Sequence, residues 1–218
     1  MMMHLDTTSA RHGMENFRNY PAVADLEDAP GAPLVFAAVL FADIKGYTRF
    51  CQSVDPHTAF RTLSTFHEQM ADIISDHSAT VMTARGDEVM AAWCGTPSSV
   101  AAKALRCGFA MLGAVAALSR NNAFPPYDLN IGVGIHAGHV VVGQIPGISD
   151  LSVYGDTVNI ASRLEQLTRT YQTDLIVSEE VVQRAIPLQQ TMEMNRFHSP
   201  IATTLRDRNG SIKIRIAR

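Results

Sequence analysis

Several features that mark particular classes of protein are scarce or missing in this sequence. Three cysteines occur in 218 residues, none of them in a CxxC pair, so a disulfide framework is not expected. Lysine and arginine number 18 against 21 aspartates and glutamates. This balance argues against a nucleic-acid binder, which normally carries a basic excess. No Walker loop, GxGxxG, GxSxG or HExxH sequence occurs, so these motifs assign no chemistry.

Long apolar runs are missing as well. No run reaches the roughly 20 residues needed to cross a bilayer. Residues 1–13 lack the apolar middle of a signal peptide. We therefore expect a cytoplasmic protein without a membrane span. With 46% hydrophobic and 18% charged residues, the chain can bury the core of one medium-sized globular domain.

The chain divides into an N-terminal extension and one folded domain. Residues 1–33 show neither helical nor strand periodicity and end in the stretch 27–33, which holds two prolines and a glycine. Such a stretch is typical of a linker. We predict an extension or linker over residues 1–33 and a single domain over residues 34–218.

Hydrophobic periodicity within the domain predicts interleaved helices and strands. Helices are expected over residues 48–77, 98–118, 157–170 and 179–185. Strands are expected over residues 34–42, 79–84, 88–93, 151–154 and 175–177, with a strand pair at 130–135 and 139–144 around Gly138 and two closing strands, the last at 211–216. Because helices and hairpins interleave, we predict an α+β fold with a mostly antiparallel sheet rather than a doubly wound parallel one.

The first segment of chemical interest is Phe41-Ala42-Asp43-Ile44-Lys45-Gly46-Tyr47-Thr48. It places a carboxylate at the end of a buried strand, followed by a glycine-containing turn into a helix. This arrangement holds Asp43 rigidly and directs backbone N–H groups towards an anion. Taken alone, Asp43 could equally serve only to satisfy the turn.

The second segment is Gly86-Asp87-Glu88, a turn between two apolar strands. By itself it indicates nothing more than a hairpin. Two carboxylates at the tips of neighbouring strands, Asp43 and Asp87, would repel each other unless a hard divalent cation bridged them. Glu88 could be a third carboxylate, but on a strand we expect it to point to the opposite face.

The third segment spans residues 154–165, from Tyr154 to Glu165. Its Gly-Asp pair predicts a strand-to-helix turn with Asp156 as the N-cap. Asn159 and Arg163 are four residues apart and so lie on one helix face. A neutral donor and a guanidinium aimed together suit a phosphorus centre that gains negative charge. The alternative is that Arg163 pairs with a surface carboxylate such as Glu165 or Glu179.

Together these segments resemble the class III adenylyl/guanylyl cyclase family, over residues 34–216. The resemblance is carried, in the family's order, by the motifs at residues 41–48, 86–91, 132–138 and 155–163. It implies the family's α+β, ferredoxin-like-derived fold, with a mostly antiparallel central sheet flanked by helices. It also implies a homodimer that pairs head to tail, with active sites at the interface and two Mg²⁺ or Mn²⁺ ions in each.

The resemblance implies roles for particular residues. Asp43, Asp87 and the Ile44 carbonyl would hold the metals, Asn159 would orient the ribose, and Arg163 would stabilise charge on the α-phosphate. The residues expected to bind the other phosphates are Lys45, Gly46, Tyr47, Thr48 and, in the closing segment, Arg206. The implied reaction is in-line attack of the ribose 3′-hydroxyl on the α-phosphate, with pyrophosphate leaving.

Two departures from the family pattern bear on substrate and assembly. The purine-reading positions are Thr83, where adenylyl cyclases usually have lysine, and Ser152. Since the glutamate expected of guanylyl cyclases is absent at Thr83, ATP is the preferred substrate, with GTP or an unselective purine site as the alternative. A third hypothesis is a non-catalytic nucleotide-binding module. The connection 145–150 is about two residues shorter than is common in the family, which predicts an altered dimer contact.

Overall fold

The computed structural model describes residues 32–120, 129–144, 151–185 and 194–217, so residues 1–31 of the predicted extension lie outside the description. The strands are β1 (Leu34–Ile44), β2 (Val81–Arg85), β3 (Glu88–Cys94), β4 (Ile131–Gly143), β5 (Ser152–Tyr154), β6 (Leu175–Ser178), β7 (Ile201–Thr204) and β8 (Ser211–Ile216). The α-helices are α3 (Tyr47–Ser53), α4 (Pro56–Asp76), α5 (Pro97–Arg120), α6 (Asp156–Thr170) and α7 (Glu179–Ala185).

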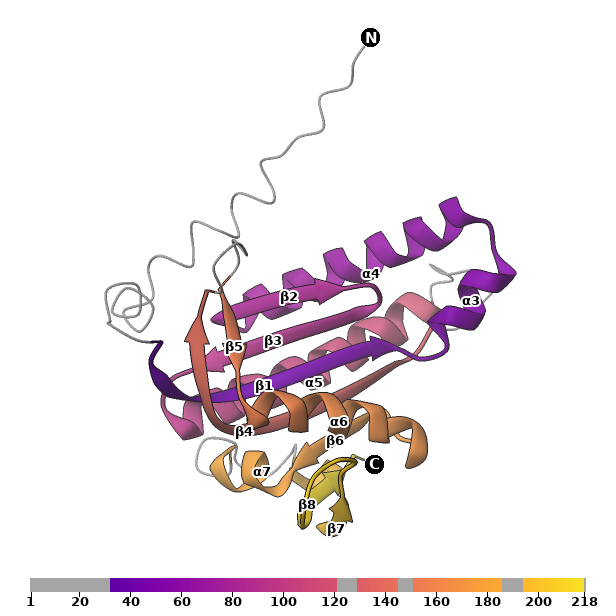
Figure 1. Cartoon of the computed structure of the whole chain (residues 1–218). Helices are drawn as coiled ribbons and strands as arrows, with labels where there is room; N and C mark the ends of the chain where they lie inside the picture. The colour runs from indigo at the N-terminus through magenta and orange to yellow at the C-terminus, as the bar shows by residue number, and fades with distance from the viewer. Residues whose placement is uncertain (1–31, 121–128, 145–150, 186–193, 218) are drawn as a thin grey trace.

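The strands form one sheet in the order β2-β3-β1-β4-β6-β8-β7, with β5 paired to β4 (Figure 1). Among these strands only β4 and β6 run parallel, and every other pair is antiparallel. The predicted α+β class with a mostly antiparallel sheet is therefore confirmed.

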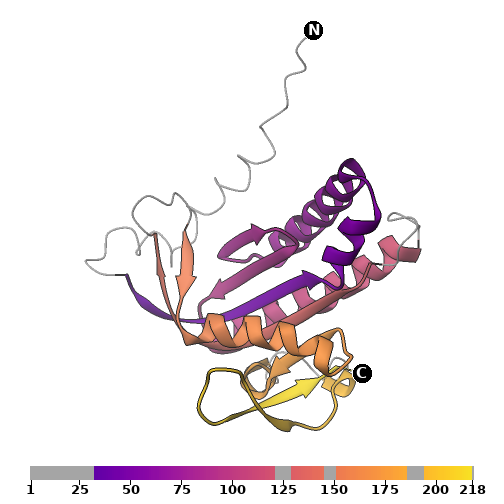
Figure 2. The ribbon, with the colours of Figure 1, turned by 45° about the vertical axis from the view of Figure 1, so that its right-hand side comes forward.

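Helices cover both faces of the sheet, but unequally. Alternate side chains of β1, from Ala38 to Ile44, pack with α4, α5 and α7 on one face. The intervening side chains Ala37, Val39 and Phe41 face the other way and pack in a second cluster that includes Ala161 of α6. Figures 1 and 2 show α6 lying across β1 and β4 on this second face. Because both faces of β1 are buried, its sequence is a continuous apolar run.

The single helix expected over residues 48–77 is wrong. The structure has two helices, α3 and α4, separated at Val54 and Asp55. The Asp55 carboxylate accepts a hydrogen bond from the Thr58 backbone N–H (3.0 Å) and caps α4, and Pro56 occupies the first helical position. Both are strong start signals, and a new helix therefore begins there.

The strand pair expected around Gly138 is also wrong, because β4 runs unbroken through this residue. Gly138 pairs with Ala37 in the β1–β4 ladder. A Cβ atom at Gly138 would lie 2.6 Å from the Thr157 hydroxyl oxygen. This glycine is therefore required for close packing against α6, and it makes no turn.

Gly132 and Gly134 extend the same contact along β4. A Cβ atom at Gly134 would lie 2.1 Å from the backbone nitrogen of Glu165 and 2.5 Å from the carbonyl oxygen of Ala161. A Cβ atom at Gly132 would lie 2.3 Å from the Thr168 hydroxyl oxygen. The backbone of α6 thus rests directly on the backbone of β4, and the glycines of the 132–138 motif make this approach possible.

One helix within the described ranges, α5, is long and apolar enough to cross a membrane by length and composition alone. Just over half of its most apolar stretch is buried, and residues such as Leu105 and Met111 pack in the core cluster. The core helix of a globular domain has the same properties. The expectation of no membrane span therefore stays a prediction.

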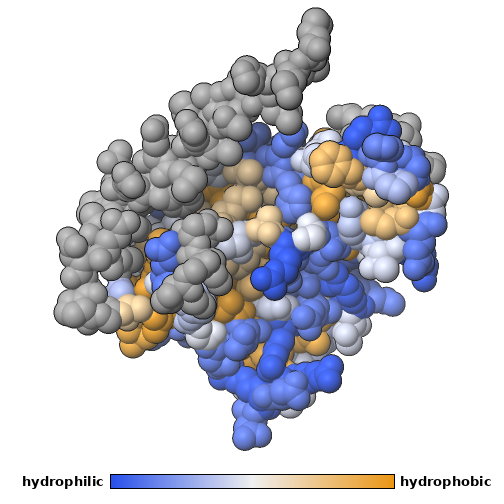
Figure 3. Space-filling view, turned by 45° about the horizontal axis from the view of Figure 1, so that its top comes forward, coloured by the Kyte–Doolittle hydropathy of each residue, from blue (hydrophilic) through white to orange (hydrophobic). Residues whose placement is uncertain are grey.

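Apolar side chains reach the surface at several places among hydrophilic ones (Figure 3). Large exposed examples in the described part of the chain are Leu34, Phe60 and Ile201. Single apolar residues of this kind are normal on protein surfaces.

Candidate active site

The alternation of β1 decides where Asp43 lies. Since Ala37, Val39 and Phe41 face the α6 side of the sheet, Asp43 points to that side too. Beyond the strand, Gly46 adopts a left-handed conformation (φ 76°) and turns the chain into α3. Asp43 is thus held at the end of a rigid central strand, as the sequence predicted.

The β2–β3 hairpin brings Asp87 next to Asp43. Gly86 in the turn is left-handed (φ 58°), a conformation that glycine adopts without strain. Burial raises the pKa of Asp43 to about 7, and the charge of the neighbouring Asp87 carboxylate contributes next. The structure therefore brings together the two carboxylates that the sequence singled out.

Two further carboxylates, Glu88 and Glu165, belong to the same cluster. The expectation that Glu88 points to the opposite face is wrong, because the β1–β3 register sets it directly across from Asp43 and directly opposed residues share a face. Glu165 comes from α6 and is buried. Burial raises the pKa of both glutamates, and Asp87 adds to the rise at Glu88.

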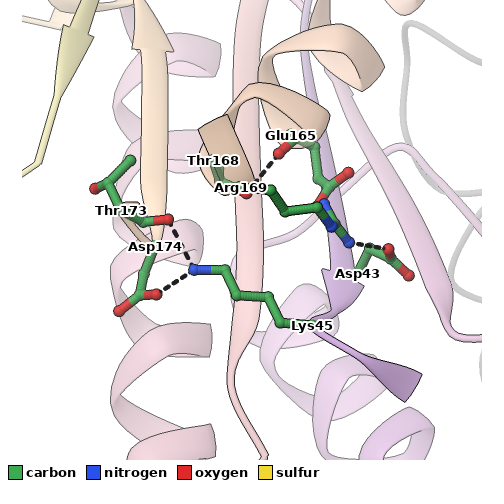
Figure 4. A network of polar contacts seen from close by, with 7 residues as sticks. All are labelled: Asp43, Lys45, Glu165, Thr168, Arg169, Thr173 and Asp174. Atoms are coloured by element: carbon green, nitrogen blue, oxygen red, sulfur yellow. Dashed lines mark hydrogen bonds and ion pairs between the residues drawn. The ribbon is translucent and has the colours of Figure 1, made fainter. Parts of the chain in front are cut away.

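Arg169, in the last turn of α6, is the cation that contacts this cluster. One guanidinium nitrogen (Nη1) lies 2.5 Å from Oε1 of Glu165, and the other (Nη2) pairs with Oδ2 of Asp43 (Figure 4). The Glu165 side chain is only 3% exposed, whereas that of Arg169 is 40% exposed. Glu165 therefore anchors Arg169 from inside the fold.

The predicted phosphate-binding loop after β1 is partly engaged elsewhere. The Lys45 ammonium donates to the Thr173 carbonyl (2.7 Å) and to Oδ1 of Asp174 (2.5 Å) in the turn after α6 (Figure 4). The Tyr47 hydroxyl donates to the Ala59 carbonyl at 3.3 Å. Gly46 and Thr48 are exposed, and Ile44 is buried with its neighbours in the core.

On α6, Asn159 is exposed and Arg163 is half-buried. The carboxylates suggested as alternative partners of Arg163 are paired elsewhere, Glu165 with Arg169 and Glu179 with Arg215. No ion pair of Arg163 occurs among the described residues. Arg163 is therefore available to a ligand.

The expectation that Asp156 caps α6 is wrong. The N-cap is Gly155, with no side-chain cap, and Asp156 is the first helical residue. Its carboxylate pairs with Arg208 at 3.2 Å. Arg206, the predicted phosphate ligand, has a 92% exposed side chain and contacts only its neighbour Asp207 among the charged groups of the described chain. Arg208 is therefore the arginine of this turn that reaches α6.

The two predicted purine-reading residues lie on neighbouring elements. Thr83 is in β2 and Ser152 is the first residue of β5, and both are half-buried. β5 contacts β2 as well as its partner β4. The connection 145–150 that precedes β5 lies outside the described residues, so its predicted effect on a dimer is untested.

The donor set fits hard divalent cations. Within the described ranges, no three His, Cys, Asp or Glu residues are arranged to hold a metal ion. Asp43 and Asp87 nevertheless lie close enough for their carboxylate charges to interact. Mg²⁺ is typically bound by one or two carboxylates, with substrate phosphates and water completing its octahedron. Two carboxylates beside an open loop match that pattern.

Comparison with curated proteins identifies cyclases as relatives. The chain is 31% identical to adenylate cyclase 1 of Rhizobium meliloti over 150 residues, 66% of this chain and 22% of that protein. It is 30% identical to an adenylate cyclase of Anabaena cylindrica over 151 residues, 66% of this chain and 30% of the relative. A uridylate cyclase of Rhodovulum is 27% identical over 180 residues, 78% of this chain and 74% of the relative. The chain thus spans less than a third of the two adenylate cyclases.

Solved structures agree on the fold. A bacterial light-regulated adenylyl cyclase matches 97% of this chain with a TM-score of 0.75 and 22% identity, over 62% of its own length. The adenylyl cyclase CyaB from P. aeruginosa matches 85% of this chain and 95% of its own, with a TM-score of 0.72 and 20% identity. The profile of the family described as the adenylate and guanylate cyclase catalytic domain matches residues 34–199. The chain belongs to the family of class III adenylyl and guanylyl cyclase catalytic domains.

Proposed function

We propose that this domain converts ATP into 3′,5′-cyclic AMP and pyrophosphate. The observation that carries the proposal is the paired carboxylates of Asp43 and Asp87, which meet at the end of β1 and the β2–β3 turn. Membership of the cyclase family supports the same reaction class. Relatives with 30% identity or more include three adenylate cyclases and two guanylate cyclases, a balance that leans towards ATP.

Asp43, Asp87 and the Ile44 carbonyl would bind two Mg²⁺ or Mn²⁺ ions. When bound, these ions would lower the pKa of the ribose 3′-hydroxyl and neutralise the triphosphate. The chain itself holds the carboxylates at fixed positions, because Asp43 directly follows the buried part of β1 and Asp87 sits in a tight hairpin. Fixed ligands favour the in-line geometry that the reaction requires.

Asn159 and Arg163 would act from the opposite side of the nucleotide. Both project from α6 and neither makes an ion pair or side-chain hydrogen bond among the described contacts. We propose that a second copy of the chain supplies them, so that each of two sites in a homodimer combines carboxylates from one protomer with Asn159 and Arg163 from its partner. Arg163 would stabilise the charge that develops on the α-phosphate.

Purine selection would rest on Thr83 and Ser152. Their hydroxyl groups donate and accept hydrogen bonds and could recognise either purine. A carboxylate at Thr83, which would favour guanine, is absent. GTP is the alternative substrate, because the relatives also include guanylate cyclases.

The test measures cyclic nucleotide formation by the purified chain with Mn²⁺ and either ATP or GTP. We expect cyclic AMP from the wild type and at least a hundredfold less from Asp43→Asn, an estimate of the order found for loss of groups that stabilise transition-state charge. The matched control is Asp72→Asn, an exposed aspartate of α4. Cyclic GMP as the main product would refute the ATP assignment, and activity of Asp43→Asn equal to wild type would refute the metal assignment.

Mixing two inactive variants tests the shared site. In an equimolar mixture of Asp43→Asn and Arg163→Ala, half of the dimers combine both chains, and each of these holds one site free of both substitutions. About a quarter of the wild-type activity should therefore return. No recovery, with subunit exchange verified by mass, would refute a site built from two protomers.

A further inference from the structure

Negative charge is concentrated where β1, the β2–β3 hairpin and α6 meet. Asp43 and Asp87 are close neighbours, and the carboxylates of Glu88 and Glu165 interact electrostatically with them and with each other. Arg85 lies opposite Glu88 in the β2–β3 hairpin, and both Arg85 and Lys45 act on the cluster electrostatically, but the Lys45 ammonium group is turned to Asp174 and the Thr173 carbonyl. Among the described residues, the ion pairs with the cluster come from one further cation.

Arg169 supplies that charge with a forked contact. Its two terminal nitrogens reach different carboxylates, Glu165 on one side and Asp43 on the other (Figure 4). The contact with Asp43 should break more easily than the contact with Glu165, because the Glu165 side chain is 3% exposed and that of Asp43 is 22% exposed. An ion pair that reaches solvent exchanges partners more easily than a buried one.

The rest of α6 fixes this arm in place. Glu165 and its backbone lie against Gly132 and Gly134 of β4 with no room for a Cβ atom, and the Thr168 hydroxyl donates to the Glu165 carbonyl at 2.6 Å. Arg169 therefore extends from a helix turn that cannot shift. Its guanidinium covers Oδ2 of Asp43, an oxygen that would otherwise be free to bind a cation.

We propose that Arg169 is the resident counter-ion of the metal site: it occupies Asp43 in the metal-free protein and must release it before a divalent cation can bind. The inference rests on the proposed role of Asp43 as a metal ligand. After release, the pair with buried Glu165 keeps Arg169 at the edge of the site. Arg169 is thus a positioning residue that weakens metal binding, and a nucleotide carrying its own metal would be favoured over the bare ion.

The test measures Mn²⁺ binding to the full chain without nucleotide, from the electron paramagnetic resonance signal of free Mn²⁺. Arg169 competes with the metal for Asp43, so Arg169→Gln should tighten Mn²⁺ binding. We expect the Mn²⁺ dissociation constant to fall about fivefold, a change whose free energy matches that of a half-exposed ion pair. Arg169→Lys keeps the charge and should stay within about twofold of wild type. Arg184→Gln is the matched control, because it removes a comparable i,i+4 arginine–glutamate pair on α7.

The sign of the change separates this role from a structural one. If Arg169 only supported the fold, its loss would leave Mn²⁺ affinity unchanged or weaken it, and either result would overturn the inference. The double variant Glu165→Gln/Arg169→Gln should bind as tightly as Arg169→Gln. A return to wild-type affinity would instead mean that freed Glu165 had become the ligand, and would also overturn it.

Failure of the proposed function gives a different pattern. Asp43→Asn should abolish Mn²⁺ binding both in the free protein and with 3′-deoxy-ATP, which lacks the attacking hydroxyl group. If Asp43→Asn binds Mn²⁺ as wild type does in both conditions, then Asp43 is not a metal ligand and both proposals fall. If Asp43→Asn abolishes Mn²⁺ binding but Arg169→Gln binds Mn²⁺ no more tightly than the wild type, then only the counter-ion role of Arg169 is refuted.

Discussion

Replacing Gly134 by alanine is the sharpest test of how α6 is held on the sheet. The added Cβ atom would lie 2.1 Å from the backbone nitrogen of Glu165, 2.5 Å from the carbonyl oxygen of Ala161 and 2.7 Å from the Cα of Glu165. All three are backbone atoms, so no side chain can rotate away to make room. The helix itself has to move off β4.

The size of the effect follows from that geometry. Overpacking in a close-packed interior typically costs about 1–3 kcal/mol, and a clash with backbone on two helix turns falls at the upper end of this range. For a domain of this size, about 3 kcal/mol lowers the melting temperature by roughly 6–12 °C. Displacing α6 also displaces Asn159 and Arg163, so we expect activity to fall more than stability alone would explain.

Thermal unfolding followed by circular dichroism measures the shift, with cyclic nucleotide formation as the second readout. The matched control is Gly113→Ala in α5, where a Cβ atom meets nothing within 4 Å. In that exposed helical position alanine should stabilise by about 0.5–1 kcal/mol. If Gly134→Ala melts at the wild-type temperature and keeps full activity, the account of the glycine contact is refuted.

Three further predictions concern stability and are measured by urea unfolding, with the single tryptophan, Trp93, as the fluorescent reporter. Burial, and then the charge of Arg208, lower the pKa of His136 to about 4. As the pH falls, the unfolded chain therefore binds a proton on this histidine before the folded chain does, and the free energy of unfolding should fall between pH 7.5 and 5. The fall should be about 2 kcal/mol larger in the wild type than in His136→Gln. An equal pH dependence in both proteins would contradict this. Phe66→Ala should cost about 3–5 kcal/mol, because Phe66 is 1% exposed in the core; a loss below about 1 kcal/mol would show that the site collapses without a cavity. Asp174→Asn should change stability by less than about 1 kcal/mol, because its pair with Lys45 is half-exposed, and a larger loss would mark that contact as structural.

The sequence predicted most elements because local pattern and tertiary burial agree in them. The apolar run of β1, the β2–β3 hairpin and the periodicity of α5 and α6 all match the structure. The wrong element boundaries arise at single proline and glycine residues. Pro56 was read as part of a continuous helix although Asp55 before it caps a new one. Gly138 was taken for a turn because a sequence does not reveal that a helix lies against it.

The candidate site was predictable only in its local parts. Asp43 and Asp87 stand out because each follows a strand, and the structure brings them together. Arg169 contacts Asp43 across 126 residues of sequence, and no short sequence motif predicts this contact. One alternative from the sequence pairs Glu165 with Arg163, whereas in the structure Glu165 pairs with Arg169. A reader of the sequence alone could have found its pairing with Arg169 from their i,i+4 spacing.

The bare contact between α6 and β4 also limits how this domain can move. A helix normally slides over a sheet by rearranging the side chains between them, but at Gly134 the backbone of α6 meets the strand with no side chain in between. The sheet and α6 must therefore travel as one rigid body. In the proposed dimer, opening or closing around a nucleotide would then fall to the connecting loops and to the rotation of one copy of the chain against the other. A ligand that acts on such a dimer at a distance would do so by turning one copy of this domain against the other.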